Sequence, residues 1–230
     1  MRWFVTGTDT DVGKSVITAC LAAAAQRTGS VVACKPVASG VPSGTAGEDA
    51  VRIARGAGHP PLVFATWEAP VSPHRAAWLA ERPAPDDLLT RIAALQADTV
   101  LVEGAGGWCV PAAAPHPGAA HHQVVWMRDL ARATGGSCVV VAADKLGVLN
   151  HTLLTVRAIQ EDGLHVAGVI LNQGLQAPDD TSIHSNADDL RWLLEVPVAL
   201  APHVPDGPGS EAIWAEVGEQ LFAQLIQSSA

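Results

Sequence analysis

Short apolar runs alternate along the chain with longer stretches in which apolar residues recur at helical spacing. Some runs, such as VVACKPV and SCVVVA, are apolar at consecutive positions, as in parallel strands that helices cover on both faces. We therefore predict strands at residues 3–7, 31–37, 99–104, 137–142 and 165–171. The helical stretches are residues 15–26, 85–97, 124–133, 148–161, 186–195 and 210–227. This alternation predicts an α/β fold in which helices flank a doubly wound, mostly parallel β-sheet.

The length of 230 residues is at the upper edge of one large domain, and the chain shows no internal repeat or linker-like break. We expect residues 1–230 to form a single domain. Loops rich in Gly, Pro and Ser are expected at the carboxyl ends of strands, where ligands of open α/β sheets bind. These loops are residues 38–47, 106–122 and 202–209, and residues 111–122 have the composition of a mobile surface loop.

Charge and hydropathy exclude several classes of partner. The net charge of -9 leaves no basic surface for nucleic acid or anionic lipid, so a small molecule is the expected ligand. The apolar runs end well short of the ~18 residues of a membrane span, and the first residues lack the features of a secretory signal. We therefore expect a cytoplasmic protein without a membrane partner. Its four cysteines are widely spaced and are expected to be reduced thiols packed as small hydrophobes.

Residues 7–15 lie between a predicted strand and a predicted helix and form a candidate phosphate loop. The backbone N–H groups of such a loop bind anions, Lys14 adds a positive charge for the β- and γ-phosphates, and the Ser15 hydroxyl can coordinate Mg²⁺. Five residues, not four, precede the GKS triplet after the first glycine, so the loop is one residue longer than the usual form. ATP and Mg²⁺ are the expected ligands; the alternative is a strand-to-helix turn that binds nothing. The loop consists of Gly7, Thr8, Asp9, Thr10, Asp11, Val12, Gly13, Lys14 and Ser15.

Two acidic residues are candidate magnesium ligands. Glu103 ends the apolar run TVLV and precedes the sequence GAGG, whose backbone can approach phosphates closely. A strand-ending Glu that only meets solvent is the alternative. Asp49 opens the helical pattern EDAVRIAR and is equally explained as an acid at a helix start. The adjacent His121 and His122 do not make a tetrahedral metal site and are interpreted as solvated loop residues.

Lys35 interrupts the second apolar run, where a buried parallel strand would continue with Val or Ile. An unpaired buried ammonium group is costly, so a phosphate or carboxylate arriving at the end of the strand is its expected partner. The alternative is an edge strand from which Lys35 reaches solvent, since Pro36 is also typical of an edge.

Six motifs occur in the order and rough spacing of one protein family, and they cover the chain from Trp3 to about Pro202. Together they make the chain similar to the dethiobiotin synthetases, the ATP-dependent carboxylases of biotin synthesis. The longer phosphate loop is itself typical of that family. The motifs are GTDTDVGKS, KPVASG, SPH at residues 72–74, VEGAGGW, KLGVLNH and GVILN.

The resemblance implies a fold of the P-loop NTPase type and a homodimer with active sites near the subunit interface. The implied reaction joins CO₂ to the two amines of 7,8-diaminopelargonic acid. One amine forms a carbamate, the γ-phosphoryl group of ATP is transferred to it, and the second amine closes the ureido ring of dethiobiotin with loss of phosphate. The enzyme would be a cyclo-ligase.

The same resemblance implies a role for each matching residue. Lys14 and Lys35, with Thr10, would stabilise the transferring phosphoryl group and the carbamate. Ser15, Asp49 and Glu103 match the magnesium environment. The implied nucleotide contacts beyond the phosphate loop are Glu103, Gly104, Ala105, Gly106, the purine-reading Asn172, and Pro202 near the base. The implied diamine contacts are Asp11, Lys35, Ser39 and, across the dimer interface at the substrate carboxylate, Lys145, Leu146, Gly147, Val148, Leu149 and Asn150.

The departures from the family pattern are small. Ser15 stands where many members have Thr, and Asp11 stands where Glu is frequent, which shortens the reach to an amine. Residues 111–122 and those after Pro202 match too weakly for residue assignments.

Two other functions use a similar phosphate loop. A cobyrinate-type amidating synthase carries an additional glutaminase domain, for which we expect no room in 230 residues. A MinD/ParA-type ATPase switch typically has a second Lys inside the loop and a basic or amphipathic partner surface. Here the early loop positions hold Thr8, Asp9, Thr10 and Asp11 instead.

Overall fold

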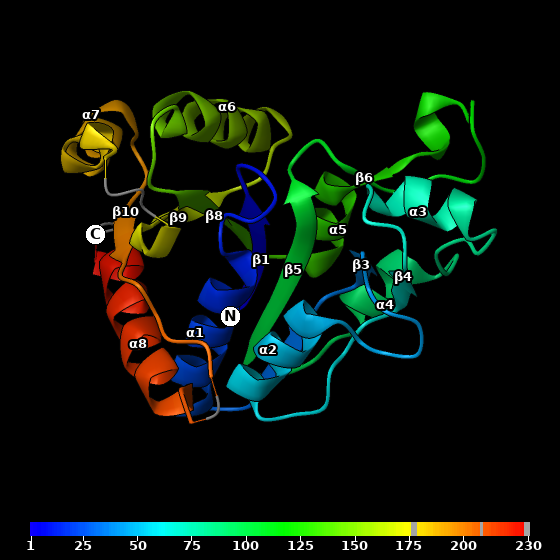
Figure 1. Ribbon diagram of the computed structural model, residues 1–230, viewed down its shortest axis with the longest axis horizontal. Coiled ribbons are helices and arrows are strands. Elements are labelled where there is room, and N and C mark those ends of the chain that lie inside the picture. Colours follow the sequence, from blue (N-terminus) through cyan, green and yellow to red (C-terminus); the bar gives the residue numbers. More distant parts are fainter. Residues whose placement is uncertain (176–178, 208, 228–230) are drawn as a thin grey trace.

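The computed structural model describes residues 1–175, 179–207 and 209–227. Its centre is a six-stranded sheet in which all neighbouring strands are parallel (Figure 1). In spatial order the strands are β10 (Val198–Ala201), β9 (Val166–Asn172), β8 (Ser137–Ala143), β1 (Arg2–Gly7), β5 (Thr99–Gly107) and β2 (Val31–Cys34). The chain winds outward from β1 in both directions, so the predicted doubly wound sheet is confirmed.

Helices cover both faces of the sheet (Figure 1). Alternate residues of the strands face opposite layers: Val5, Leu101 and Ile170 pack in one apolar cluster, and Phe4 and Val102 in the other. The first layer holds α1 (Lys14–Gln26), α2 (Glu48–Ala57) and α8 (Glu211–Gln227). The second layer holds α3 (Pro73–Leu79), α4 (Leu88–Ala93), α5 (Met127–Thr134), α6 (Val148–Glu161) and α7 (Asn186–Leu193).

The small side chains of α1 let two helices approach it closely. A Cβ atom added to Gly56 of α2 would lie 2.3 Å from the Ala19 carbonyl oxygen, and one added to Gly218 of α8 would lie 2.0 Å from the Cys20 carbonyl oxygen. Both distances are shorter than any real contact, so glycine is required at each crossing. This packing fixes how α2 and α8 lie against α1, the helix that follows the candidate phosphate loop.

Several short elements lie outside the central sheet. A parallel pair is formed by β3 (Val37–Ser39) and β4 (Ala65–Trp67), and an antiparallel pair by β6 (Pro111–Ala113) and β7 (Val125–Trp126). Single 3₁₀ turns lie at His121–Gln123, Gln173–Leu175 and Thr181–His184. Among the described residues, the search for a helix with the length and apolarity of a membrane span finds none.

Several predicted elements differ from the observed ones. The second predicted strand stops at Cys34, because Lys35 N–H bonds to the Leu62 carbonyl and Pro36 has no N–H, so that Val37 opens β3 instead. The helix predicted at 85–97 is reduced to α4, and the start of the helix predicted at 124–133 is β7. Strand β10 and helix α3 were not predicted. In the loop predicted at 202–209, residue 208 lies outside the described residues.

The cysteines are free thiols, as predicted. Cys20, Cys34 and Cys138 are buried, and burial raises the pKa of each thiol to about 12. Cys109 is exposed, so the prediction that it packs as a small hydrophobe is wrong.

Candidate active site

The phosphate loop connects β1 to α1 at the carboxyl edge of the sheet. Its start is held by a hydrogen bond from Thr8 N–H to the Val141 carbonyl at 3.0 Å. Gly13, with φ of 91°, is left-handed, and a Cβ atom there would lie 2.1 Å from Asn172 Nδ2. Only glycine fits both requirements. Asp11 also has a left-handed backbone, with φ of 54°. The loop therefore has the irregular backbone that brings successive N–H groups to one side.

A cavity of about 230 Å³ opens at the start of α1. The helix has no side-chain N-cap, so the N–H groups of its first turn are available to a ligand. Lys14 belongs to this first turn, whereas Arg52 lines the cavity from α2 with its guanidinium paired to Asp49 and Asp206. The lining residues are Asp11, Gly13, Lys14, Ser15, Val16, Asp49, Arg52 and Leu175. The amide donors and the charge of Lys14 together suit a phosphate chain.

Lys14 is buried, with 6% of its surface exposed, and its Nζ donates to the Asp9 carbonyl at 2.8 Å. Burial, followed by the nearby charge of Lys35, lowers the pKa of Lys14 from 10.5 to about 8. Both effects penalise the charged ammonium group, and an anion bound beside it would reverse them. Lys14 is therefore placed to gain interaction energy from a phosphate.

Lys35 is the centre of a buried ionic cluster. Its Nζ lies 2.5 Å from Glu103 Oε1, 3.1 Å from Asp49 Oδ2 and 3.2 Å from the Gly104 carbonyl oxygen. Burial alone would lower the pKa of Lys35, but the charges and hydrogen bonds of Glu103 and Asp49 outweigh it and raise the pKa. The same ion pair, with hydrogen bonds from Ser15 and Lys35, keeps the pKa of Asp49 below its usual value although burial opposes this.

The alternative interpretation of Lys35 is wrong in one respect. The lysine does follow an edge strand, since β2 lies at the end of the sheet, but its side chain is buried and does not reach solvent. Its anionic partners in the chain itself are carboxylates from β5 and α2, and its contact with a ligand stays a prediction.

Glu103 lies inside β5 and not at its end, because the strand continues to Gly107. The alternative of a solvated boundary residue is wrong, since none of Glu103 is exposed. Its Oε1 accepts hydrogen bonds from Ser15 Oγ at 2.7 Å and from Lys35 Nζ. Its Oε2 has no hydrogen-bond partner among the described residues, although it is buried. A buried carboxylate oxygen without a donor is an available ligand for a cation.

The oxygen atoms around Glu103 fit Mg²⁺. Ser15, Asp49 and Glu103 supply a hydroxyl and two carboxylates, which are the hard oxygen ligands that Mg²⁺ prefers. Among the residues that the structure describes, no group of three or more His, Cys, Asp or Glu side chains is placed to hold a metal ion. Such a site would be completed by phosphate oxygens and water, as is usual for Mg²⁺ at nucleotide sites.

The last residues of β5 pack against the start of the phosphate loop. A Cβ atom on Gly107 would lie 3.4 Å from the Gly7 carbonyl oxygen, and one on Gly106 would lie 3.8 Å from Thr10 Cγ2. Of the predicted nucleotide contacts at residues 104–106, Gly106 is therefore beside Thr10, whereas a Cβ atom on Gly104 would lie 2.9 Å from Phe4 Cζ. Ala105 N–H points to the Met127 sulfur at 3.4 Å and is already engaged.

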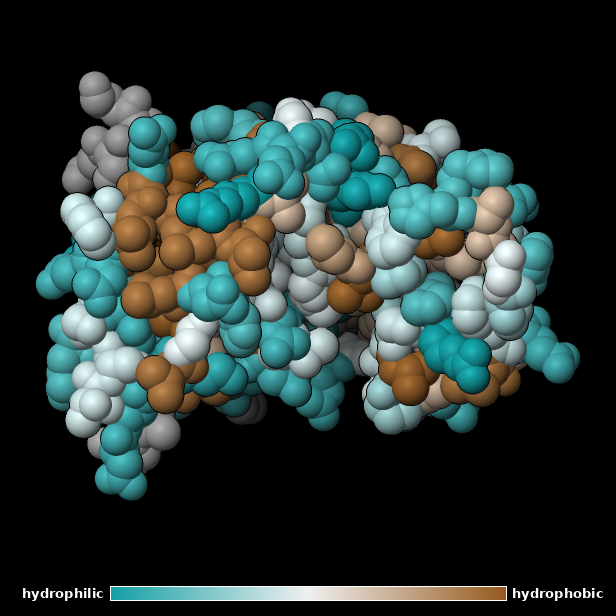
Figure 2. All heavy atoms as spheres, turned by 90° about the horizontal axis from the view of Figure 1, so that it is seen from above, coloured by the Kyte–Doolittle hydropathy of each residue, from teal (hydrophilic) through white to brown (hydrophobic). Residues whose placement is uncertain are grey.

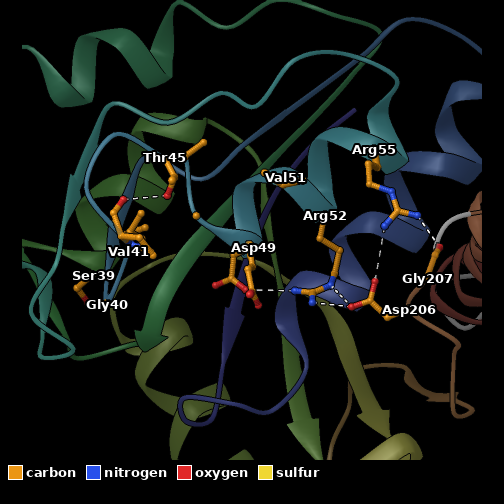
Figure 3. A pocket seen from close by; sticks show the side chains of 15 residues that line it. Ser39, Gly40, Val41, Thr45, Asp49, Val51, Arg52, Arg55, Asp206 and Gly207 are labelled. Atoms are coloured by element: carbon orange, nitrogen blue, oxygen red, sulfur yellow. Dashed lines mark hydrogen bonds and ion pairs between the residues drawn. The ribbon is translucent and has the colours of Figure 1, made fainter.

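Ser39 lines a second and larger cavity of about 790 Å³ together with Asp49 (Figure 3). This cavity lies between the 38–47 loop, α2 and residues 206–207. The predicted diamine contact Ser39 thus shares a cavity with the predicted metal ligand Asp49. The side chain of Arg52 lies at this cavity too and reaches from Asp49 to Asp206 (Figure 3).

Asn172 ends β9 and lies against the phosphate loop. Its Nδ2 donates to the Val12 carbonyl at 3.0 Å, and its Oδ1 accepts from Gly174 N–H at 3.0 Å. The side chain therefore braces the loop, and the purine-reading role stays a prediction. Pro202 follows β10 and is exposed.

Residues 145–150, which are predicted to contact the substrate carboxylate, form the turn before α6 and the first residues of that helix. Leu146 is 80% exposed, Val148 is buried and Gly147 has φ of 92°. The Leu146 N–H, expected to be free for a ligand, donates to Asp180 Oδ2 at 2.6 Å. In the described part of the chain, none of the six lines the cavities at Lys14 and Ser39.

Sequence reasoning missed Arg52 and Asp206. Arg52 stands three residues after Asp49 in a predicted helical pattern, and this i,i+3 spacing was a usable signal. Asp206 carried no signal, because its contact with Arg52 spans 154 positions of sequence.

Comparison with known proteins identifies the family. The protein family described as an AAA domain matches residues 1–206. The ATP-dependent dethiobiotin synthetase BioD of Rhodococcus jostii (strain RHA1) is 42% identical over 213 residues, covering 89% of this chain and 86% of the relative. The same synthetase from Parafrankia sp. (strain EAN1pec) is 39% identical and covers 98% of this chain and 90% of the relative.

A solved structure is similar in fold. The septum site-determining protein MinD of Pyrococcus horikoshii OT3, complexed with Mg-ADP, has a TM-score of 0.51 at 16% identity, covering 97% of this chain and 93% of that chain. At this identity the likeness shows the fold alone, and it confirms the predicted P-loop NTPase architecture. The sequence matches decide the family: the chain belongs to the ATP-dependent dethiobiotin synthetases of biotin synthesis and is a ligase.

Proposed function

We propose that this enzyme uses ATP and Mg²⁺ to carboxylate 7,8-diaminopelargonic acid with CO₂ and to close the ureido ring of dethiobiotin, releasing ADP and phosphate. The observation that carries the proposal is the buried Lys35, held between Glu103 and Asp49 beside the phosphate loop. We further propose that residues 1–230 act as one domain.

The proposed reaction has two charged stages that the lysines would stabilise. A carbamate formed on one amine of the diamine attacks the γ-phosphorus of ATP, the bond to the ADP oxygen breaks, and a carbamic-phosphoric anhydride results. The second amine then attacks the carbonyl carbon and phosphate leaves. Lys14 and Lys35 would bind the oxygens on which negative charge gathers, with Thr10 at the same loop.

The magnesium ion would be held by Ser15, Asp49 and Glu103, and when bound it would neutralise charge on the β- and γ-phosphates. Glu103 supports this role because its buried Oε2 lacks a donor among the described residues. The hydrogen bond of 2.7 Å from Ser15 Oγ to Glu103 Oε1 supports this role, because it brings two of the three proposed oxygen ligands together.

The diamine would lie between the phosphate loop and the large cavity. Asp11 and Ser39 provide a carboxylate and a hydroxyl that suit an amine. On the other side of the loop, Asn172 and Pro202 would face the adenine. The hydrogen bonds of Asn172 to Val12 and Gly174 support a further role for it in fixing the loop.

The substrate carboxylate would be received by residues 145–150 of a second copy, so the enzyme would act as a homodimer. Seen from the side of α6 and α7, the molecule has a broad apolar area (Figure 2). The exposed apolar side chains here are Leu154 of α6, Trp192 and Leu193 of α7, and Leu146 in the turn before α6. Large exposed apolar patches are typical of protein interfaces. Light scattering after gel filtration measures the oligomeric state, and a monomer at assay concentration would contradict this part of the proposal.

The test is a reaction of purified protein with ATP, Mg²⁺, bicarbonate and diaminopelargonate, in which phosphate release and dethiobiotin are both measured. Equal amounts of phosphate and dethiobiotin are expected. The variant Lys35→Arg keeps a buried positive charge at this position. It should nevertheless lose most of the turnover, because the bulkier guanidinium group disturbs the ionic cluster.

The same assay separates the alternatives. A MinD/ParA-type switch would hydrolyse ATP whether or not the diamine is present. An amidating synthase would require a nitrogen donor. Phosphate release that is independent of the diamine, with no ureido product, would refute the proposed function.

A further inference from the structure

Arg52 stands between the two cavities of the site. It lies one turn after Asp49 on α2, and its side chain lines both the cavity at Lys14 and the larger one at Ser39. Only 21% of its side chain is exposed. A mostly buried guanidinium in this position carries a full charge that must be balanced by neighbours.

Its contacts join two carboxylates from distant parts of the chain (Figure 3). Arg52 Nε and Nη2 lie 2.7 Å and 2.5 Å from Asp206 Oδ2, and Nη1 lies 3.4 Å from Asp49 Oδ1. Asp206 belongs to the segment after β10 that begins with Pro202. Arg52 thus connects the metal side of the proposed nucleotide site to its base side.

The two oxygens of Asp49 are held by different cations. Lys35 binds Oδ2 from the buried side, and Arg52 binds Oδ1 from the cavity side. Ser15 also donates a hydrogen bond to Asp49. Because 47% of the Asp49 side chain is exposed, its orientation depends on these few polar contacts. When Lys35 turns to the reacting carbamate, Arg52 is the cation that remains on Asp49.

We infer that Arg52 is a positioning residue: it holds the Asp49 carboxylate in place for Mg²⁺ and, through Asp206, couples metal binding to the segment that carries Pro202. This inference rests on the proposed function, in which Asp49 is a metal ligand. Residues that orient metal ligands typically change metal affinity by about 10- to 100-fold when they are replaced.

Calorimetry of ADP binding, with and without Mg²⁺, tests the inference without turnover. In the wild type, Mg²⁺ should tighten ADP binding. Arg52→Ala should lose about 10-fold or more of that gain while its metal-free ADP affinity stays within about 2-fold of the wild type. Asp206→Asn should show a smaller loss of the same kind, and the double variant should lose no more than Arg52→Ala alone, because the two residues act as one unit.

Arg55 provides a matched control. It lies one turn further along α2, bonds to Glu211 and the Gly207 carbonyl, and packs over the Trp214 ring at 4.7 Å, so it holds the same segment. Its Nη1 also lies 4.0 Å from Asp206 Oδ1, much farther than the 2.5 Å between Arg52 Nη2 and Asp206 Oδ2. No contact joins it to Asp49 among the described residues. Arg55→Ala should therefore lower the melting temperature while the gain from Mg²⁺ is retained. Arg52→Lys, which keeps the charge but not the paired N–H groups, should restore part of the gain.

Three results would overturn the inference. Equal losses with and without Mg²⁺ in Arg52→Ala would make Arg52 a direct phosphate contact. If Mg²⁺ tightens ADP binding to Arg52→Ala as much as it does to the wild type, Arg52 is a structural residue only. If the wild type itself forms dethiobiotin yet shows no Mg²⁺ gain for ADP, the inference fails and the proposed function survives; if it shows neither product nor gain, both fail.

Discussion

Because Lys14 is buried, we expect its positive charge to destabilise the folded protein until an anion binds beside it. Burial and the charge of Lys35 lower the pKa of Lys14 from 10.5 to about 8. Since one pKa unit corresponds to about 1.4 kcal/mol, this lowering costs the folded state roughly 3 kcal/mol at neutral pH. Lys14→Met removes the charge but also the hydrogen bond to the Asp9 carbonyl, a loss of about 1 kcal/mol. The variant should therefore be more stable than the wild type by about 2 kcal/mol at pH 7.

The advantage of the variant should depend on pH. Below pH 8, Lys14 is protonated in both the folded and the unfolded protein, and the folded state carries the full cost. Between about 8 and 10.5, the folded protein has released the proton that the unfolded chain still holds, so wild-type stability rises with pH. At pH 10.5 the cost is gone, and the retained hydrogen bond leaves the wild type at least as stable as Lys14→Met.

Urea unfolding followed by tryptophan fluorescence at intervals from pH 7 to 10.5 measures both free energies. Lys145→Met, at an exposed position, is the control for replacing Lys by Met and should change the free energy of unfolding by less than about 0.5 kcal/mol. Saturating ADP should stabilise the wild type much more than Lys14→Met. A Lys14→Met variant that is less stable at pH 7, or a difference that does not shrink with rising pH, would refute the reasoning.

Three further substitutions test the rest of the site. Lys35→Met should cost about 3–5 kcal/mol of unfolding free energy because it leaves Glu103 buried and unpaired, and adding Glu103→Gln should recover most of it; urea unfolding without recovery would contradict the ion pair. Gly13→Ala should cost roughly 2 kcal/mol or more and weaken ADP binding in calorimetry, and Gly147→Ala, with a similar φ but no atom within 4 Å, should cost only the strain of about 1 kcal/mol. Asp180→Asn should raise the KM for diaminopelargonate several-fold without changing the KM for ATP, because it loosens the turn before α6; equal changes in both KM values would argue against that role.

The central strands and their helices could be predicted because each strand is buried on both faces and so is apolar at consecutive positions. Helix α6 begins and ends where its pattern predicts, at Val148 and Glu161. Strand β10 was missed because it has four residues and follows Pro197, and β3 was merged with β2 because the apolar run continues through Pro36. Such short elements owe their existence to neighbouring strands, which a local pattern does not contain.

The site residues, too, could be predicted only where they lie close together in the sequence. The phosphate loop is contiguous, so its residues and their chemistry could be predicted together. The need of Lys35 for an anion was also predictable from its apolar surroundings, but its partner Glu103 lies 68 positions away, and local sequence does not choose between that carboxylate and a phosphate. Arg52 and Asp206 become a pair only when α2 and the segment after β10 meet.

The charges of the site are already balanced in the chain itself, and this constrains how ligands can bind. Lys35 is paired with Glu103 and Asp49, so a phosphate that draws Lys35 toward itself leaves the buried Glu103 without its cation and Asp49 with Arg52 alone. A divalent metal on those carboxylates would conversely repel Lys35 unless a phosphate received it. Either ligand binding alone therefore leaves a buried charge unpaired, which costs free energy. When Mg²⁺ and ATP bind together, each ion pair that is broken is replaced by a new one. In the proposed site, nucleotide and metal should consequently bind with positive coupling, each tightening the other by the same factor.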